Sequence, residues 1–295
     1  MKLQAIEAFL AIVETGSIRS GARKIGLSQP AMSKVLRALE EELGVGLLTR
    51  GVKGVELTEF GRLFYHRAAA IQNESLKARE EIQQLLGHAG GSVSIAMAPA
   101  AALKVAPLVL TDFFKSMPGT RLHFYEGLQT FAVDNLRTGM LDLAICPVFS
   151  PISEREFVVT PLFDTSLKVV ARKDSPYDQV SSLEELQEAR WVNIVSGASV
   201  SPLINEAYLS KGLPAPKKVV ECYSFSSALP LVLKSDMLGL FPDEWVSVPG
   251  ISADLSILSI DDLPVNRLNL IYRRDQPLTP IAQHMATLIL RLAEL

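Results

Sequence analysis

Residues 9–61 read FLAIVETGSIRSGARKIGLSQPAMSKVLRALEEELGVGLLTRGVKGVELTEFG, and this stretch decides the fold of the N-terminal part of the chain. Apolar residues recurring every three or four positions predict short helices that end at Gly16 and Gly26. Ser17 and Ser28 stand where the N-caps of the second and third helices belong. Two short helices joined by a glycine-containing turn predict a helix-turn-helix.

The third helix is expected to present a polar and cationic face. Gln29, Ser33 and Arg37 are four residues apart and therefore share one side of the helix. The opposite side carries apolar residues, and Pro30 is tolerated in the first turn, where no intrahelical donor is lost. An α-helix fits the major groove of B-DNA, where each base pair shows a distinct pattern of donors and acceptors. This helix is therefore the candidate recognition helix.

Each residue of that face has an expected role on DNA. Gln29 can donate and accept at once, which suits adenine, and Ser33 can read a base edge or bind phosphate. Lys34 and Arg37 are expected to anchor phosphates, although arginine can also read guanine. Ser28 and the free amides of the first turn can hold a phosphate oxygen, and simple helix capping explains Ser28 equally well.

The segment after the third helix predicts a two-stranded hairpin. Residues 47–50 and 55–57 are strand-like and flank a loop that contains Gly51 and Gly54. A hairpin that follows a helix-turn-helix is a wing. Arg50 and Lys53 lie where such a wing would meet phosphate or the minor groove.

The charge of the chain is unevenly spread. The formal net charge is −3, yet no acidic residue occurs between Glu14 and Glu40. That interval carries the basic residues Arg19, Arg23, Lys24, Lys34 and Arg37. Such a cluster is expected where phosphates are contacted, although a basic cluster by itself is often a solvated helix face.

A long helix is expected next, capped by Thr58 and running to about Leu86, before Gly87, Gly90 and Gly91. Its heptad pattern predicts a dimerisation helix. The heptad positions are Phe64, Ile71, Ala78 and Leu85, with Ala68, Ser75 and Ile82 in the seam between them. Because Ser75 and Ala78 make this seam weak, packing of the helix on its own domain is the alternative.

From Ser92 onward, strand-like and helix-like segments alternate, which predicts a parallel or mixed sheet covered by helices. The length of this region indicates two subdomains, with chain crossings near Phe163 and Asn266. The expected strands are 93–97, 121–125, 142–146, 168–171, 191–194, 219–222 and 238–241. The expected helices include 103–116, 129–138, 203–211 and 226–234.

Ligands of open α/β sheets bind beyond the carboxyl ends of the strands. Three turns that follow expected strands are therefore candidate binding sites. The residues expected to bind a small molecule are Ala98, Pro99, Ala100, Ala101, Leu128, Gln129, Thr130, Ser196, Ser199, Ser201 and Phe225. The serine-rich turn at 196–201 could hold a carboxylate or a sulfonate. Phe149 is a further candidate for the pocket wall, although an isolated phenylalanine is more often a core residue.

Residues 9–61 closely resemble the DNA-binding region of LysR-type transcriptional regulators. The resemblance rests on Ala22, the run 28–33, Leu39-Glu40, Arg50, Leu57-Thr58 and Gly61. It implies an α/β fold class with a winged helix-turn-helix (1–58), a linker helix and hinge (59–90) and an effector-binding domain (91–295). The effector domain would have a periplasmic-binding-protein-like fold of two α/β lobes, about 91–163 with 267–295 and about 164–266.

The resemblance also implies a way of working. Gln29, Pro30 and Ser33 would make the specific DNA contacts, and Arg50 would touch the backbone. The family assembles through its linker helices, commonly as homotetramers, and RNA polymerase is a further expected partner. One recognition helix is too little for a specific site, so a two-fold dimer reading an inverted repeat is expected.

A small-molecule effector bound between the lobes would change the spacing of the DNA-binding heads. Relatives often place Ser or Thr in the first of the three turns, where this chain has Ala98–Ala101. That departure favours an apolar-bodied, aromatic small anion as the effector.

Three other classes of protein are alternatives to this interpretation. Four scattered histidines and the absence of GxSxG, Walker and GxGxxG patterns argue against an enzyme, a metal site or a bound cofactor. A redox sensor would use Cys146 and Cys222, which are better explained as buried thiols at the ends of two strands. The basic helix pair argues against a metabolite-binding domain without a DNA function.

The composition, 48% hydrophobic and 21% charged over 295 residues, is typical of a folded protein of about two domains. Glu7 and Glu14 interrupt the N-terminal apolar pattern, so no signal peptide is expected. No apolar run is long enough to span a membrane, and two cysteines fit a reducing compartment. A cytoplasmic protein without membrane contact is therefore expected.

Overall fold

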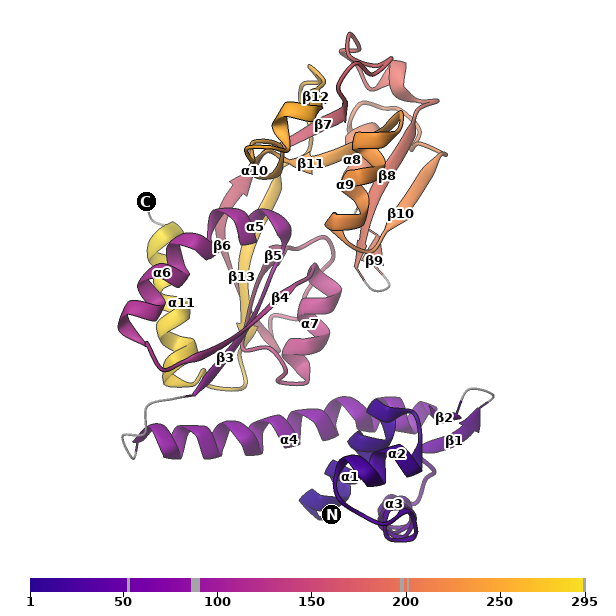
Figure 1. Cartoon of the computed structure of the whole chain (residues 1–295), viewed down its shortest axis with the longest axis vertical. Helices are drawn as coiled ribbons and strands as arrows, with labels where there is room; N and C mark the ends of the chain where they lie inside the picture. The colour runs from indigo at the N-terminus through magenta and orange to yellow at the C-terminus, as the bar shows by residue number, and fades with distance from the viewer. Residues whose placement is uncertain (52–53, 86–90, 197–198, 201, 294–295) are drawn as a thin grey trace. The chain divides into compact units, whose positions relative to one another are not determined.

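The computed structural model describes residues 1–51, 54–85, 91–196, 199–200 and 202–293 (Figure 1). These form two compact units, one of residues 1–88 with the short stretch 137–140, the other of residues 89–136 and 141–295. None of the helices within the described ranges is both long and apolar enough to cross a membrane.

The N-terminal unit is a helix-turn-helix followed by a hairpin and a long helix. Its elements are α1 (Leu3–Thr15), α2 (Ile18–Lys24), α3 (Gln29–Leu43), β1 (Leu48–Gly51), β2 (Gly54–Leu57) and α4 (Glu59–Leu85). The expected caps are present: Gly16 ends α1 at φ 68°, and Ser17 Oγ accepts the backbone N–H of Ser20. Gly21 allows α1 and α2 to approach closely. A Cβ at this position would lie only 3.0 Å from the backbone of Ile12.

One apolar core holds this unit together. Phe9 and Ile12 of α1, Met32 and Leu39 of α3 and Leu47 before β1 are fully or almost fully buried in it. The beginning of α4 completes the core, with the rings of Phe9 and Phe64 in edge contact at 5.2 Å. The burial of these apolar side chains stabilises the packed helices and offsets the conformational entropy that the chain loses on folding.

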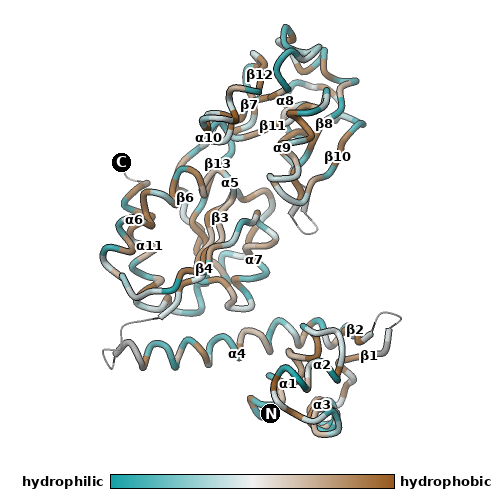
Figure 2. Tube along the Cα trace, in the orientation of Figure 1, coloured by the Kyte–Doolittle hydropathy of each residue, from teal (hydrophilic) through white to brown (hydrophobic). Residues whose placement is uncertain are grey.

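The α4 helix departs from the expected seam over its first turns. Ala68 is completely buried and Phe64 is half-buried, both against the core of their own unit. For this part of the helix the structure therefore agrees with the alternative, packing on the own domain. Figure 2 shows hydrophilic and hydrophobic stretches alternating along α4. The side chain of Leu85 lies outside the described residues.

The second unit contains two sheets, which define two lobes. The first lobe has the strand order β4-β3-β5-β13-β6, in which β3 pairs parallel with β4 and β5, and β13 runs antiparallel to β5 and β6. Its strands are β3 (Ser92–Met97), β4 (Arg121–Glu126), β5 (Leu143–Pro147), β6 (Phe157–Thr165) and β13 (Asn266–Arg273). Its helices are α5 (Pro99–Lys104), α6 (Ala106–Ser116), α7 (Gln129–Arg137) and α11 (Pro280–Ala293).

The second lobe has the order β10-β8-β11-β7-β12, with the short β9 paired to β8. Its strands are β7 (Leu167–Arg172), β8 (Arg190–Ser196), β9 (Ser199–Val200), β10 (Val219–Cys222), β11 (Met237–Pro242) and β12 (Leu255–Ile257). Its helices are α8 (Leu203–Ser210), α9 (Phe225–Lys234) and α10 (Asp243–Val246), with 3-10 turns at Glu184–Leu186 and Ser252–Asp254. Side chains of α8 and α9 enter two different core clusters of this lobe.

The chain passes between the lobes twice, from β6 to β7 and from β12 to β13, and the two passages are tied together. The Thr165 hydroxyl donates to the backbone oxygen of Asn266 at 3.0 Å, and the Asn266 side-chain Nδ2 donates to Thr165 Oγ1 at 2.9 Å. Both residues are buried. This pair fixes the register of the crossing strands beside the space between the lobes.

Several segments differ from the expected elements, since β6, β9, β12 and β13 are not among the expected strands and one expected helix is divided. The expected helix 103–116 is two helices that break at Val105, because Pro107 lacks the N–H that a continuous helix would need there. The strand β6 was not expected at all. It contains Pro161, which lies opposite Asn269 at an irregularity of the ladder, on the edge strand of its sheet. An edge position tolerates the missing backbone donor of proline.

Candidate nucleic-acid interface and ligand pocket

The α3 helix separates a buried from an exposed face as expected. Met32, Leu36 and Leu39 are buried, while every expected DNA-contacting residue of this helix and its cap is exposed. These exposed residues are Ser28, Gln29, Pro30, Ser33, Lys34 and Arg37. Ser28 Oγ accepts the backbone N–H of Ala31 at 3.3 Å, so it caps the helix while its side chain stays accessible.

Two of the five cations of this region have acidic partners. Arg37 Nε lies 2.9 Å from Glu41 Oε1 on the same helix, and Lys24 pairs with Glu14 of α1. The side chains of Arg37 and Glu41 are 82% and 65% exposed, so this ion pair is weak and can be exchanged for a phosphate. Arg19, Arg23 and Lys34 are exposed as well. The region therefore carries a net positive charge, but a smaller one than the number of its basic residues implies.

The expected wing is present as an antiparallel hairpin of β1 and β2, with Arg50 opposite Val55. Its base is attached to the end of α1, since Val55 N donates to Gly16 O at 3.0 Å. A side chain at Gly54 would lie 2.6 Å from that same oxygen, so only glycine allows this contact. For Arg50 the structure describes the backbone alone, and Lys53 lies outside the described residues.

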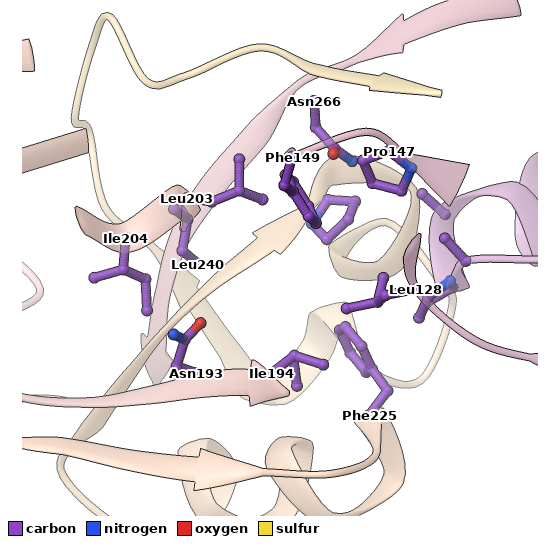
Figure 3. Close-up of a pocket in the computed structure, with 14 residues that line it drawn as sticks. Leu128, Pro147, Phe149, Asn193, Ile194, Leu203, Ile204, Phe225, Leu240 and Asn266 are labelled. Carbon is purple, nitrogen blue, oxygen red and sulfur yellow. The ribbon is translucent and has the colours of Figure 1, made fainter. Parts of the chain in front are cut away.

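A cavity of about 50 Å³ lies between the two lobes of the second unit (Figure 3). The first lobe contributes Ala98, Pro99, Ala100, Leu128, Pro147 and Phe149. The second lobe contributes Asn193, Ile194, Leu203, Ile204, Phe225, Leu240 and Pro242, and Asn266 begins the strand that returns to the first lobe. Among these lining residues none is charged, and only the two asparagines have polar side chains.

The cavity brings together part of the expected ligand-binding set. Ala98, Pro99, Ala100, Leu128 and Phe225 line it, and so does Phe149. Ala101, Gln129 and Thr130 are not part of its lining. The side chains of Ser196 and Ser199 are not described, and Ser201 lies outside the described residues, so their role stays a prediction.

Gln129 is a support of the wall instead. This buried side chain accepts the backbone N–H groups of Phe149 and Ser150 at 2.7 and 3.0 Å. Its Nε2 donates to the Ser150 oxygen at 2.7 Å. The amide therefore holds the loop that carries Phe149 into the pocket, which makes Gln129 a positioning residue.

The opposite wall is stiffened by aromatic packing. Phe225 stacks on Trp245 with ring centroids 3.8 Å apart, and it also meets Phe241 at 4.7 Å. Stacked rings of this kind add to the stabilisation from burial alone. Phe225 therefore presents a fixed apolar surface to the cavity.

The lining also contains residues that were not expected to bind a ligand: Pro147, Asn193, Ile194, Leu203, Ile204, Leu240, Pro242 and Asn266. Several of these lie in or at the ends of strands, whereas the expected residues lie mainly in the turns that follow strands. A usable signal was present in Asn193, a polar residue inside the apolar run WVNIV. A polar residue in a buried strand usually has a specific partner.

The two cysteines are free and buried, one in each lobe. Burial raises the pKa of the Cys146 thiol to about 12. The thiolate is the reactive form of cysteine, and at neutral pH this thiol is almost entirely protonated. Among the described residues, no group of three His, Cys, Asp or Glu side chains is placed to hold a metal ion.

Family models and curated relatives agree along the chain. A model described as the LysR substrate binding domain matches residues 86–294, and one described as a bacterial regulatory helix-turn-helix protein of the lysR family matches residues 3–62. The chain is 26% identical over 287 residues to the HTH-type transcriptional regulator GbpR of Azospirillum brasilense, covering 96% of this chain and 84% of GbpR. It is 28% identical over 271 residues to TdcA of Escherichia coli (strain K12), covering 90% and 84%.

Solved structures show the same fold. The crystal structure of CbnR, a LysR family transcriptional regulator, matches with a TM-score of 0.74 at 20% identity over 99% of both chains. CbnR complexed with its target DNA matches with a TM-score of 0.71, also at 20% identity, over 99% of this chain and 100% of that one. The effector binding domain of QuiR in complex with shikimate matches with a TM-score of 0.60 at 17% identity, over 70% of this chain and 98% of that domain.

The family models together cover both units, and the matched relatives are transcriptional regulators. The chain belongs to the LysR family of DNA-binding transcriptional regulators, with an N-terminal helix-turn-helix and a C-terminal effector-binding domain of two lobes.

Proposed function

We propose that the protein binds inverted-repeat promoter sites as a two-fold dimer and that a small molecule bound between the lobes controls this binding. The observation that carries the proposal is the α3 helix, whose exposed polar side lies opposite a side packed in the core. The functional division we propose is 1–58 for DNA binding, 59–90 for the linker and 91–295 for effector binding.

On the DNA, Gln29, Pro30 and Ser33 read base edges in the major groove. Ser28, Lys34 and Arg37 hold phosphates on either side of the groove, and Arg50 and Lys53 of the wing contact the backbone beside it. Support comes from the exposure of the six residues on α3 and its cap. The CbnR structure with its target DNA shows that this fold supports DNA binding in that protein.

Dimerisation through α4 is supported by an apolar stripe that is not covered within the unit. Phe60, Leu63, Ile71 and Ile82 are exposed by 55%, 71%, 41% and 56% and lie near one side of the helix, together with the exposed Ala78. A second copy of α4 would cover this stripe and place two recognition helices around a two-fold axis. We expect two such dimers to associate into a homotetramer, as is common in the family.

Control by a small molecule rests on the cavity between the lobes, whose walls come from both. Of the ligand classes expected from the sequence, the described lining supports an aromatic body better than an anionic group. A ligand that prefers one arrangement of the lobes shifts the protein toward it. We propose that this shift acts, without any catalytic step, on transcription by RNA polymerase in the cytoplasm, where the target duplex lies.

The experiment is a selection of randomised duplexes with the purified full-length protein, followed by a measurement of the stoichiometry of the bound complex. We expect an enriched inverted repeat bound by an even number of protomers. The double variant Phe60→Glu, Leu63→Glu serves as a control that leaves α3 intact, and it should bind half-sites without the preference for the repeat. Selection of unrelated sequences, or of a single half-site bound by one protomer of the wild type, would contradict the proposal.

A further inference from the structure

We propose that the pocket between the lobes takes an uncharged, mostly apolar small molecule with one hydrogen-bond donor, and that this donor binds Asn266 Oδ1. The inference rests on the proposed function, in which this pocket receives the effector. It adds the chemical class of the ligand and the atom that recognises it.

Within the part of the chain that the structure describes, the lining holds no charged group that would neutralise an anion. Twelve of the 14 residues that line the cavity are apolar, and none of them is charged. A charge that is buried without a partner costs far more than a hydrogen bond returns.

Proline removes the backbone donor at three strand or helix ends that line the cavity. Anions at such positions usually bind free backbone N–H groups. Here Pro147 ends β5, Pro242 ends β11 and Pro99 begins α5, and proline has no N–H. The N–H of Ala98 is already donated to Ile145 O at 2.8 Å. These features favour an uncharged ligand.

One acceptor in the wall has no partner. Asn266 is 4% exposed, and its Oδ1 makes no hydrogen bond to any described residue. Leaving a buried acceptor unpaired is unfavourable, so a ligand that supplies a donor binds more tightly than one that does not. Figure 3 shows the amide end of Asn266 pointing toward the side of the pocket where Phe149 and Pro147 lie. The other polar lining residue, Asn193, already has an interaction within the protein.

The hydrogen bonds around Thr165 fix which amide atom is the free one. The single hydroxyl proton of Thr165 is donated to the backbone oxygen of Asn266. Its oxygen can therefore only accept from the side chain of Asn266, at 2.9 Å, so the atom facing it is the amide nitrogen. The remaining atom, Oδ1, is an acceptor, which requires a donor on the ligand.

The walls also set the size and shape of the ligand. Phe149 from one lobe and Phe225 from the other offer ring surfaces to it. The cavity of about 50 Å³ is smaller than the roughly 150 Å³ in which a benzene ring is known to bind. A ligand of one ring therefore fits only when the lobes lie slightly farther apart, and it shifts the protein toward that arrangement, as control requires. A small phenol or aromatic alcohol fits these requirements.

Three probes that share a 4-methylphenyl group test the class of ligand on the full-length protein. The probes are 4-methylphenol, which has a donor, 4-methylanisole, which has none, and 4-methylbenzoate, which is an anion. Calorimetric titration should show saturable binding of 4-methylphenol, binding of 4-methylanisole that is at least about tenfold weaker, and no binding of 4-methylbenzoate.

Two variants test the atom. In Asn266→Leu the difference between 4-methylphenol and 4-methylanisole should disappear, because the acceptor is gone. In Asn266→Asp the protein should gain binding of 4-methylbenzylammonium, which the wild type rejects. Misfolding cannot produce a gain of ligand binding. The Asn266→Asp variant therefore tests the role of this position even if Asn266→Leu folds poorly.

Binding of 4-methylbenzoate equal to or tighter than that of 4-methylphenol would overturn the inference, and so would failure of the wild type to bind 4-methylphenol at millimolar concentration. An unchanged preference for the donor in Asn266→Leu would overturn the role of Oδ1. The selection of randomised duplexes, carried out with the same protein preparation, tests the proposed function independently of these ligands. Specific DNA binding combined with recognition of an anion would remove this inference and leave the proposed function standing.

Discussion

Lys104 on α5 and Glu244 on α10 form an ion pair between the two lobes, with Nζ 3.5 Å from Oε1. The ammonium group also lies 4.4 Å from the ring centroid of Phe163, a cation-π distance. The Glu244 side chain is only 17% exposed, so solvent screens this pair less than a surface ion pair. Because α5 begins with pocket residues and Pro242 directly precedes α10, the pair connects two walls of the cavity.

Breaking this pair should loosen the contact between the lobes. A double-mutant cycle with Lys104→Ala and Glu244→Gln should give a coupling of about 1 kcal/mol in the free energy of unfolding. Both tryptophans, Trp191 and Trp245, lie in the second unit, so their fluorescence in urea follows the unfolding of that unit. Strictly additive single and double variants would show that the two side chains do not stabilise each other.

Gln29 should carry sequence discrimination. The variant Gln29→Ala removes a side chain that donates and accepts at a base edge, so discrimination at one base pair of each half-site should fall by about 1–3 kcal/mol. Titrations against the selected site and its single-base variants measure this. Lys34→Ala is the control, expected to weaken binding to all sequences by a similar factor. Discrimination that is unchanged in Gln29→Ala would contradict the role of this residue.

Arg37 should act through charge and in competition with Glu41. Arg37→Ala should lower the slope of log affinity against log salt by about 1 for each protomer, because one phosphate contact is lost. Glu41→Ala should bind DNA more tightly at low salt, since it frees Arg37 from the 2.9 Å ion pair. Fluorescence anisotropy across a salt series distinguishes the two. A wild-type slope in Arg37→Ala would place this cation away from the backbone.

The helix-turn-helix could be predicted closely from the sequence because its signals are local. Glycines after α1 and α3 and serines before α2 and α3 mark the ends, and periodic apolar residues mark the buried faces. The seam of α4 was less predictable. A heptad pattern shows that a face is apolar, and it does not say whether the own domain or a partner covers it. Phe64 and Ala68 fit the heptad pattern, yet they pack in the core of their own unit.

The pocket could be predicted only in part. Turns that follow strands can be read from the sequence, which led to Ala98, Leu128 and Phe225. For Asn266 the sequence predicts only a crossing between the lobes. Its place in the wall depends on its pairing with Thr165, more than a hundred residues away along the chain. Periodicity carries no information about such a pairing. The role of Gln129 as a support likewise depends on a loop 20 residues away.

Cys146 should be unreactive in the folded protein. Its pKa is raised to about 12 by burial, so the thiolate is scarce at pH 8, and the side chain is inaccessible. In a Cys222→Ser background, Ellman's reagent should label no thiol in the native state and one thiol in urea. Rapid native labelling, or a change in DNA binding on treatment with peroxide that Cys146→Ser abolishes, would revive the redox alternative.

Gly61 should be essential for the junction between the wing and α4. A Cβ at this position would lie 2.0 Å from the backbone oxygen of Leu47, and that oxygen also accepts the N–H of Thr58 at 3.0 Å. Since backbone atoms cannot turn away as a side chain can, Gly61→Ala should destabilise the N-terminal unit by about 3 kcal/mol.

Hydrogen exchange of the α1 amides measures this stability directly, because α1 packs in the core that the junction supports. Protection there should fall by about two orders of magnitude in Gly61→Ala, with specific DNA binding lost at the same temperature. Glu59→Ala, an exposed change in the same turn of α4, should stay within about 0.5 kcal/mol of the wild type. The tryptophan transition of the second unit should not move in either variant. If protection of α1 in Gly61→Ala equals that of the wild type, the close approach of Gly61 to Leu47 does not constrain the fold.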